Sequence, residues 1–193
     1  MKNPVKGKVK TRLAKSIGNE KALQIYKMLL HYTGNIVAQL KNCDKAIFYS
    51  DFIDKNDMWD KDFYQKYVQD GSDLGERMKN AFAFEFQNKY EKVLIIGTDC
   101  HELKTEMLQK AFETLDNNDV VIGPAIDGGY YLLGMKSLHK ELFENIPWST
   151  ENVLLDSINI LKKLQLKYHL LPALSDIDTE DNIGELGKIQ IKK

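Results

Sequence analysis

Four consecutive apolar residues, Val93–Ile96, lead into the turn-forming sequence Gly97, Thr98 and Asp99. The run is too short for a helix, and side chains that are apolar on both faces are typical of a strand with helices packed on either side. Residues 119–122 and Tyr130–Met135 have the same character and predict two further strands. Such strands belong to layered α/β folds.

Segments with helical periodicity alternate with these strands. Apolar residues recur every three or four positions over residues 19–40, which predicts a long helix with Gly34 as a point of interruption. The same reasoning predicts helices over 74–89, 104–115 and 149–166, and strands over 45–50 and 168–171. The acidic, aromatic stretch 51–69 is expected to hold a loop, a short helix over 57–64 and a strand over 66–69. The alternation favours a three-layer α/β/α sandwich with a mostly parallel mixed sheet.

Composition excludes several classes of protein. With 193 residues, 43% of them hydrophobic and 28% charged, residues 1–193 fit one globular domain. A net charge of −1 argues against a nucleic-acid partner. The longest uncharged stretch, residues 28–40, is too short for a membrane span. The absence of a signal-like start and of a CxxC pattern around Cys43 and Cys100 predicts a cytoplasmic protein with reduced thiols.

The N-terminal segment is basic, and arginine is rare in the whole chain. Six of its first fifteen residues are cationic and none is acidic, yet of the 27 cationic residues in the chain only Arg12 and Arg77 are arginines. A guanidinium can form two parallel hydrogen bonds to a phosphate or carboxylate. Residues 3–12 therefore form a candidate phosphate-binding loop, although they do not match the Walker A spacing. A solvated basic tail is the alternative.

Acidic residues follow two of the predicted strands. Asp99 comes directly after Val93–Ile96, and Asp176 and Asp178 would share one side of an extended segment after the last strand. Ligands bind at the carboxyl ends of strands in open α/β sheets, and carboxylates there can hold Mg²⁺ together with phosphate oxygens. The structural alternatives are that Asp99 caps the helix near Lys104 and that Asp178 caps a terminal helix over 180–189.

Glycines surround Asp127 in the segment 123–131. They would allow a ligand to approach the backbone closely, or Gly128 and Gly129 could form only a hairpin turn. The chain has no GxSxG elbow, and its four histidines form no HExxH or zinc-binding spacing. Hydrolase chemistry of the serine or zinc type is therefore not indicated.

Six motifs occur in the order KTRLAKSIG, QDGSDLGERM, IIGTDC, GPAIDGGYYLLG, IPWST and DIDTEDN. In this order they resemble the DUF2064 family of small bacterial glycosyltransferase-like proteins, often called radical-SAM/selenodomain-associated transferases. That family resembles the nucleotide-diphospho-sugar transferases of GT-A fold, among which are guanylyl- and cytidylyltransferases. The resemblance spans nearly the whole chain and implies Mg²⁺ or Mn²⁺ as cofactor. The partners it implies are a nucleotide sugar or nucleotide and a small-molecule acceptor.

The resemblance also implies roles for individual residues. Lys10 and Arg12 would hold the nucleotide phosphates, and Asp99 would bind the metal, assisted by Asp178 with Asp176 beside it. Asp99 and Asp127 are the implied catalytic residues. The implied nucleotide or acceptor pocket consists of Asp73, Arg77, Gly128, Gly129, Tyr130 and Trp148. The chain has His101 where family members usually have proline.

Three functions are compatible with these motifs. The leading hypothesis is transfer of a sugar from a nucleoside diphosphate sugar to an acceptor. The first alternative is nucleotidyl transfer from a nucleoside triphosphate on the same phosphate loop. The second is a nucleotide-binding module that has lost catalysis. The motifs carry no signal for an oligomeric state.

The start of the chain departs from the family pattern. Relatives have an apolar strand before the phosphate loop, whereas only three residues precede Pro4 here. An empty central strand position would leave buried polar groups without partners, at a cost of about 1 to 3 kcal/mol each. We therefore expect the native protein to begin upstream with an apolar strand, and we expect the first dozen residues of this chain to be poorly anchored.

Overall fold

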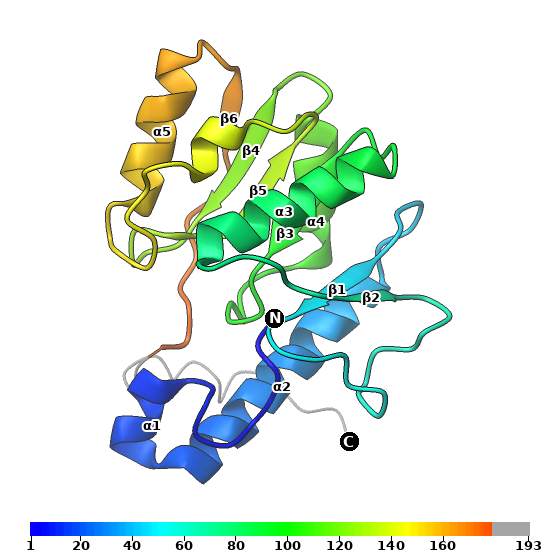
Figure 1. Cartoon of the computed structure of the whole chain (residues 1–193), viewed down its shortest axis with the longest axis vertical. Helices are drawn as coiled ribbons and strands as arrows, with labels where there is room; N and C mark the ends of the chain where they lie inside the picture. The colour runs from blue at the N-terminus through cyan, green and yellow to red at the C-terminus, as the bar shows by residue number, and fades with distance from the viewer. Residues whose placement is uncertain (179–193) are drawn as a thin grey trace.

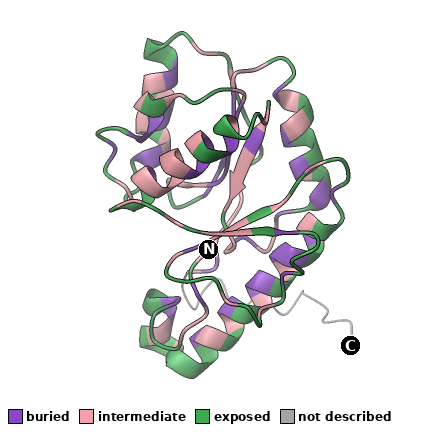
Figure 2. Ribbon diagram, turned by 45° about the vertical axis from the view of Figure 1, so that its right-hand side comes forward, coloured by how far each residue is buried: buried purple, intermediate pink, exposed green. Residues whose placement is uncertain are grey.

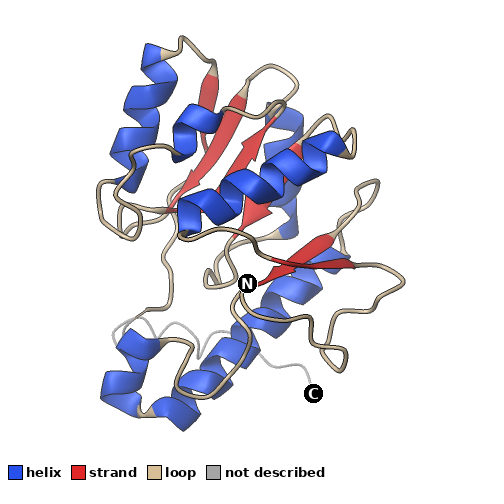
Figure 3. Ribbon diagram, viewed as in Figure 1, coloured by secondary structure: helices blue, strands red, loops and turns tan. Residues whose placement is uncertain are grey.

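The computed structural model describes residues 1–178, which form a four-stranded sheet with helices on both faces and a separate two-stranded sheet (Figures 1 and 3). The helices are α1 (Thr11–Ile17), α2 (Asn19–Ala38), α3 (Leu74–Gln87), α4 (Thr105–Thr114) and α5 (Val153–Lys163), with a 3₁₀ turn η1 (Lys140–Phe143). The strands are β1 (Ala46–Tyr49), β2 (Gln65–Val68), β3 (Val93–Ile96), β4 (Val120–Pro124), β5 (Tyr130–Met135) and β6 (Tyr168–Leu170).

The larger, four-stranded sheet has the strand order β3-β5-β4-β6. Strand β5 is antiparallel to both β3 and β4, whereas β6 is parallel to β4. All five residues of β4 are buried, as expected for a strand covered on both faces. The expected α/β class is confirmed, with a mixed sheet in which parallel and antiparallel pairs both occur.

Helices cover both faces of this sheet. Leu108 of α4 and Leu115, directly after α4, pack with Ile36 of α2 on one face. Phe82 of α3 and Leu161 of α5 belong to the cluster on the other face. Figure 1 shows α3 in front of the sheet and α4 behind it. In Figure 2 the buried residues lie on the sheet and on the helix faces turned toward it. This is the three-layer sandwich that the alternation predicted.

The smaller sheet is the parallel pair β1-β2, in which Ala46 pairs with Gln65. It packs on α2 through a small cluster around Trp59. Helix α2 continues through Gly34, where a Cβ atom would lie 2.6 Å from Met58 and 3.2 Å from the Trp59 ring. Gly34 therefore makes room for this packing and does not interrupt the helix.

One local prediction was wrong, and one helix was missed. Residues 57–64 form turns instead of a short helix, because the side chains of Asp57 and Asp60 accept hydrogen bonds from the backbone of Trp59 and Asp62. Such local bonds compete with helix formation. Helix α1 was not predicted, because its seven residues bury only Leu13 and give no periodic signal.

The expectation of a poorly anchored N-terminal segment was also wrong. The Met1 amine donates to the Phe48 carbonyl at 2.6 Å, and Ser50 N–H donates to the Met1 carbonyl at 2.9 Å. Asn3 is 2% exposed, and its side chain bonds the backbone of Asp51 and Phe52. Backbone pairing and one buried amide thus fix the segment to the end of β1.

Cys43 and Cys100 are both free thiols. Among the helices of residues 1–178, none has the length and apolar character that a membrane crossing requires.

Candidate active site

The candidate site lies where β3 ends and the chain after β6 passes by. The N–H of Ile177 donates to the Asp99 carbonyl at 3.1 Å, and the Ile177 side chain is fully buried against Leu29. Figure 1 shows this segment descending from the sheet to the level of α1. Because Ile177 points inward, Asp176 and Asp178 lie on its other side, as the alternation predicted. The segment thereby brings two carboxylates beside Asp99.

Lys10 joins the two acidic segments. Its ammonium contacts Asp99 Oδ2 and Asp178 Oδ1, each at 2.9 Å, and its side chain is only 3% exposed. The bond to Asp178 links positions 168 residues apart in the sequence. The solvated-tail alternative is therefore wrong for Lys10. Burial alone would lower the pKa of Lys10, but the charges and hydrogen bonds of Asp99 and Asp178 outweigh it and raise the pKa.

The backbone places Lys10 in this position. Lys10 adopts a left-handed conformation, with φ 46° and ψ 46°, directly before α1. The preceding residue, Val9, is buried against Tyr26 and Leu30 of α2. A left-handed conformation is uncommon for a residue with a side chain, and it is retained where surrounding contacts stabilise it. Here the two ion pairs and the packing of Val9 provide those contacts.

Arg12 lies at the edge of the same cluster. Its guanidinium nitrogen Nη1 is 3.7 Å from Asp178 Oδ2, and 68% of its side chain is exposed. An exposed pair of this kind contributes little to stability. The guanidinium is therefore available to a ligand that approaches Asp178 from solvent.

Negative charge is concentrated around Asp176. Burial first, and then the neighbouring charges of Asp99 and Asp127, together raise the pKa of the Asp176 carboxyl to about 7, while Lys10 opposes the shift. Asp127 is thus close enough to influence the acidic segment electrostatically. A bound cation would relieve this repulsion.

The carboxylates fit a cation that is shared with a phosphate ligand. Among residues 1–178 no group of three or more His, Cys, Asp or Glu side chains has the arrangement of a complete metal site. Asp99 and Asp178, however, both contact the one ammonium of Lys10, so their oxygens converge on a common point. Mg²⁺ usually binds one or two protein carboxylates and completes its shell with phosphate oxygens and water. Asp99 does not cap α4, whose N-cap position is Lys104.

Gly128 and Gly129 lie in the hairpin turn between β4 and β5, which was one of the two roles that the sequence left open for them. Asp127 accepts the Gly129 N–H at 3.0 Å, and Gly128 has φ 90°. A Cβ atom on Gly128 would lie 2.1 Å from the Glu151 carbonyl oxygen, so the segment before α5 packs directly on the turn. The carbonyl of Gly128 accepts the N–H of Leu154. The turn therefore fixes Asp127 near the acidic segment as well as closing the hairpin.

Tyr130 and Trp148 form an aromatic group with Phe143. The Trp148 ring is nearly parallel to Phe143 and perpendicular to Tyr130, with 6.3 Å between centroids in both pairs. It also covers α3 at Gly75, where a Cβ atom would lie 1.9 Å from the Trp148 ring nitrogen. In the structure Trp148 thus packs α3 onto the sheet.

The structure does not bring Asp73 and Arg77 to Lys10. The Asp73 carboxylate caps α3 by accepting the Glu76 N–H at 2.8 Å, and Arg77 Nε donates to the Gly71 carbonyl at 3.0 Å. Arg77 lines a cavity between β1 and β3 instead. Their predicted role in nucleotide binding stays a prediction.

Sequence reasoning missed the residues that hold the basic loop. The hydroxyl of Tyr26 accepts from Lys2 N–H and donates to the Lys2 carbonyl, and burial raises its pKa to about 12. Asn3 fixes the chain to the residues after β1. Neither belongs to a local motif of charged or glycine residues, so the sequence offered no signal for these contacts.

The family model "Uncharacterized protein conserved in bacteria (DUF2064)" matches residues 33–150. The chain is 28% identical over 185 residues to the 2-phospho-L-lactate guanylyltransferase of Methanocaldococcus jannaschii, which covers 92% of this chain and 76% of that protein.

Two solved structures show the same architecture. The first is a protein of Desulfovibrio desulfuricans G20 provisionally assigned as a nucleotide-diphospho-sugar transferase, with a TM-score of 0.89, 32% identity, and coverage of 100% of this chain and 86% of that one. The second is the 4-diphosphocytidyl-2C-methyl-D-erythritol synthase of Anaerococcus prevotii. Its TM-score is 0.56 at 14% identity, with 80% of this chain and 82% of that one covered, so it supports the fold alone. The nucleotide-diphospho-sugar transferase fold that the motifs implied is confirmed.

Proposed function

Because the chain belongs to the DUF2064 family, we propose that it is a metal-dependent transferase that binds a nucleoside diphosphate sugar and transfers the sugar to a small acceptor. The observation that carries the proposal is the Lys10 ammonium held between Asp99 and Asp178. It joins the basic loop, the end of β3 and the acidic segment at one point. A cationic group beside two carboxylates is the chemistry that a diphosphate and a divalent cation require together.

Each residue of the cluster has a part in this proposal. Lys10 and Arg12 bind the phosphate oxygens, and Arg12 does so from the solvent side, where most of its guanidinium is exposed. Asp99 and Asp178 hold Mg²⁺ or Mn²⁺. When bound, the cation supplies positive charge that stabilises the diphosphate leaving group. Asp127 is fixed by the hairpin turn and lies close enough to Asp176 to raise its pKa, and in this proposal it is the catalytic carboxylate that serves the acceptor.

Nucleotidyl transfer is the second candidate, and the guanylyltransferase relative favours it. The same cationic loop would then hold a triphosphate, and the acceptor would attack the phosphorus atom next to the nucleoside. The two reactions release different products. Sugar transfer releases a nucleoside diphosphate, whereas nucleotidyl transfer releases pyrophosphate.

Product analysis separates these reactions. The protein is incubated with Mn²⁺ and a panel of nucleotide sugars, and separately with nucleoside triphosphates, each with a pool of small phosphate- and hydroxyl-bearing acceptors. Acceptor-dependent release of a nucleoside diphosphate supports sugar transfer. Release of pyrophosphate would contradict sugar transfer and support nucleotidyl transfer. Binding without turnover in both panels would favour a nucleotide-binding module.

The first predicted variant tests the metal ligand. We expect Asp99→Asn to fold but to lose most Mn²⁺-dependent nucleotide binding, about tenfold or more in Kd, because the amide keeps the size and loses the charge. Isothermal titration with and without Mn²⁺ measures this change. Asp62→Asn is the matched control, since the Asp62 side chain is exposed in the loop 57–64. If Asp99→Asn bound nucleotide and Mn²⁺ as tightly as the wild type, the assignment of Asp99 as a metal ligand would be wrong.

A further inference from the structure

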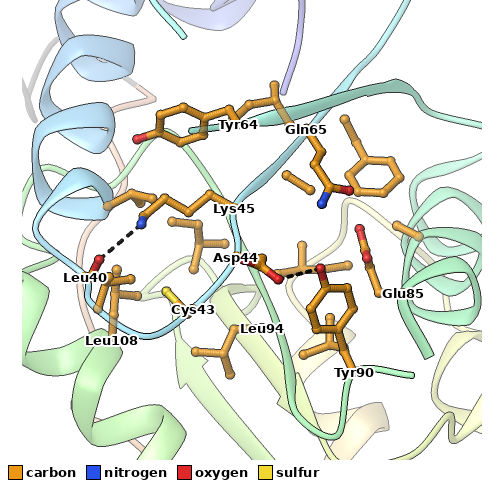
Figure 4. Close-up of a pocket in the computed structure, with 18 of the residues that line it drawn as sticks. Leu40, Cys43, Asp44, Lys45, Tyr64, Gln65, Glu85, Tyr90, Leu94 and Leu108 are labelled. Atoms are coloured by element: carbon orange, nitrogen blue, oxygen red, sulfur yellow. Dashed lines mark hydrogen bonds between the residues drawn. The ribbon is translucent and has the colours of Figure 1, made fainter. Parts of the chain in front are cut away.

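Lys10 differs from other covered lysines of the fold in the number of carboxylates that it contacts. The ammonium of Lys45, at the cavity between β1 and β3, donates to the neutral Leu40 carbonyl at 3.1 Å (Figure 4). Lys66 pairs with one carboxylate, that of Asp57, at 2.6 Å. Among the lysine ion pairs within residues 1–178, only those of Lys10 join one ammonium to two carboxylates, each at 2.9 Å. Lys10 thus takes the position of a cation that two acidic ligands share.

The Lys10 ammonium competes with any divalent cation that binds the same two carboxylates. Mg²⁺ binds carboxylate oxygens at about 2.1 Å, and the Lys10 nitrogen is 2.9 Å from Asp99 Oδ2 and from Asp178 Oδ1. A cation on these oxygens would therefore lie within about 5 Å of the ammonium, and the two positive charges would repel each other. The Asp99 and Asp178 side chains are 39% and 38% exposed, so a cation can reach them from solvent.

Binding of a phosphate by Lys10 also requires its ammonium to change partners. A phosphate arrives from solvent, where 68% of the Arg12 side chain is exposed but only 3% of the Lys10 side chain. Arg12 Nη1 is 3.7 Å from Asp178 Oδ2, and Lys10 contacts the other oxygen of the same carboxylate. A phosphate held by Arg12 therefore lies next to Lys10 and offers its ammonium a new partner of opposite charge.

The chain around Lys10 is fixed on both sides, so the exchange falls to the side chain. Val9 is buried against Tyr26, whose hydroxyl bonds the backbone N–H and C=O of Lys2. On the other side of Lys10, Leu13 of α1 is fully buried. The lysine stem has four carbons and rotates freely where contacts allow. The ammonium can therefore exchange partners while the backbone of the basic loop keeps its place.

We propose that Lys10 is an internal counter-ion, which holds the place of the divalent cation between Asp99 and Asp178 until a phosphate ligand draws its ammonium away. This inference rests on the proposed function, in which these carboxylates bind the cation and the basic loop binds the phosphates. Cation and phosphate then bind cooperatively, because the phosphate removes the charge that competes with the cation. The cation alone binds weakly.

Equilibrium dialysis of Mn²⁺, with and without inorganic pyrophosphate, tests the proposal in the absence of turnover. The free solution is the same on both sides of the membrane, so complexes of Mn²⁺ with pyrophosphate outside the protein cancel. Lys10→Met removes the charge and keeps the length of the side chain, whereas Lys10→Arg keeps the charge. Lys45→Met is the matched control, because its ammonium bonds a neutral carbonyl.

We expect Lys10→Met to bind Mn²⁺ alone about tenfold or more tightly than the wild type, while Lys10→Arg and Lys45→Met bind it as weakly as the wild type. Pyrophosphate should strengthen Mn²⁺ binding about tenfold or more in the wild type, and by a smaller factor in Lys10→Met. In EDTA, Lys10→Met should melt about 3 °C or more below the wild type, because two carboxylates lose their counter-ion. Mn²⁺ should restore most of this loss.

Three results would contradict the proposal. If Lys10→Met bound Mn²⁺ no more tightly than the wild type, the counter-ion role would be wrong, and joint binding of nucleotide and Mn²⁺ would leave the proposed function standing. If the wild type bound Mn²⁺ equally well with and without pyrophosphate, the counter-ion role would be wrong whichever variants fold. If no protein bound Mn²⁺ even with pyrophosphate, the metal site of the proposed function would fail as well.

Discussion

At the scale of single residues, Arg12 and Lys10 carry the same charge in different surroundings. Lys10 is buried between two carboxylates, whereas most of Arg12 is exposed. If Arg12 binds phosphate through two parallel bonds, Arg12→Lys should weaken nucleotide binding by about 1 to 3 kcal/mol although the charge is retained. Titration of wild type, Arg12→Lys and Arg12→Ala should give affinities in that order. Equal affinities for all three proteins would mean that Arg12 is a solvated surface residue with no part in nucleotide binding.

Asp176 gives a prediction about pH. Its carboxyl has a pKa of about 7 in the folded protein and an ordinary, lower value when unfolded. Between these values the unfolded carboxyl is ionised while the folded one holds its proton, so the free energy of unfolding falls as pH rises and the loss is complete above pH about 7. Asp176→Asn removes this loss.

Melting curves of Asp176→Asn and wild type should therefore coincide near pH 4 and separate toward pH 8. We expect the variant to melt about 3 °C or more higher at pH 8. Asp178→Asn is the contrasting variant, because it breaks the ion pair with Lys10 and should lower the melting temperature at pH 8. A wild-type melting temperature for Asp176→Asn at pH 8 would mean that the carboxyl is not perturbed.

At the scale of elements, the β4-β5 turn depends on one of its two glycines. Gly128 has φ 90° and packs against the backbone of Glu151, whereas a Cβ atom on Gly129 would meet only the Asp127 side chain, at 3.3 Å. Gly128→Ala should therefore lower the free energy of unfolding by about 2 kcal/mol or more, and Gly129→Ala by less than about 1 kcal/mol. Urea unfolding of both variants measures the difference. Similar losses would show that the segment before α5 can move aside.

At the scale of the whole molecule, the site joins both ends of the described chain. Lys10 belongs to the N-terminal segment and Asp178 ends the C-terminal one, so a ligand bound between them should stabilise the entire fold. A nucleotide with Mn²⁺ at about 100 times its Kd should add about 2.7 kcal/mol and raise the melting temperature by about 5 to 10 °C. The shift should be absent in Asp99→Asn. A full shift without Mn²⁺ would argue against a metal at the site.

The sequence by itself determined the elements of the larger sheet and their class. Val93–Ile96 and Tyr130–Met135 were predicted to the residue, because short apolar runs between turns are a local pattern. The acidic segment 176–178 was predicted with its correct alternation around Ile177. The motifs also implied Lys10, Arg12 and Asp99 as one site, although their spacing alone could not place them together.

Tertiary structure decided the rest. The order β3-β5-β4-β6, the contact of Lys10 with Asp178, and the anchoring of the first residues by Asn3 and Tyr26 all depend on pairs that are distant in sequence. Such contacts leave no periodicity, because each partner looks like an ordinary polar residue among its own neighbours. The separation of the β1-β2 pair from the four-stranded sheet has the same origin, because which strand edges pair depends on the segments of backbone that the folded chain brings side by side.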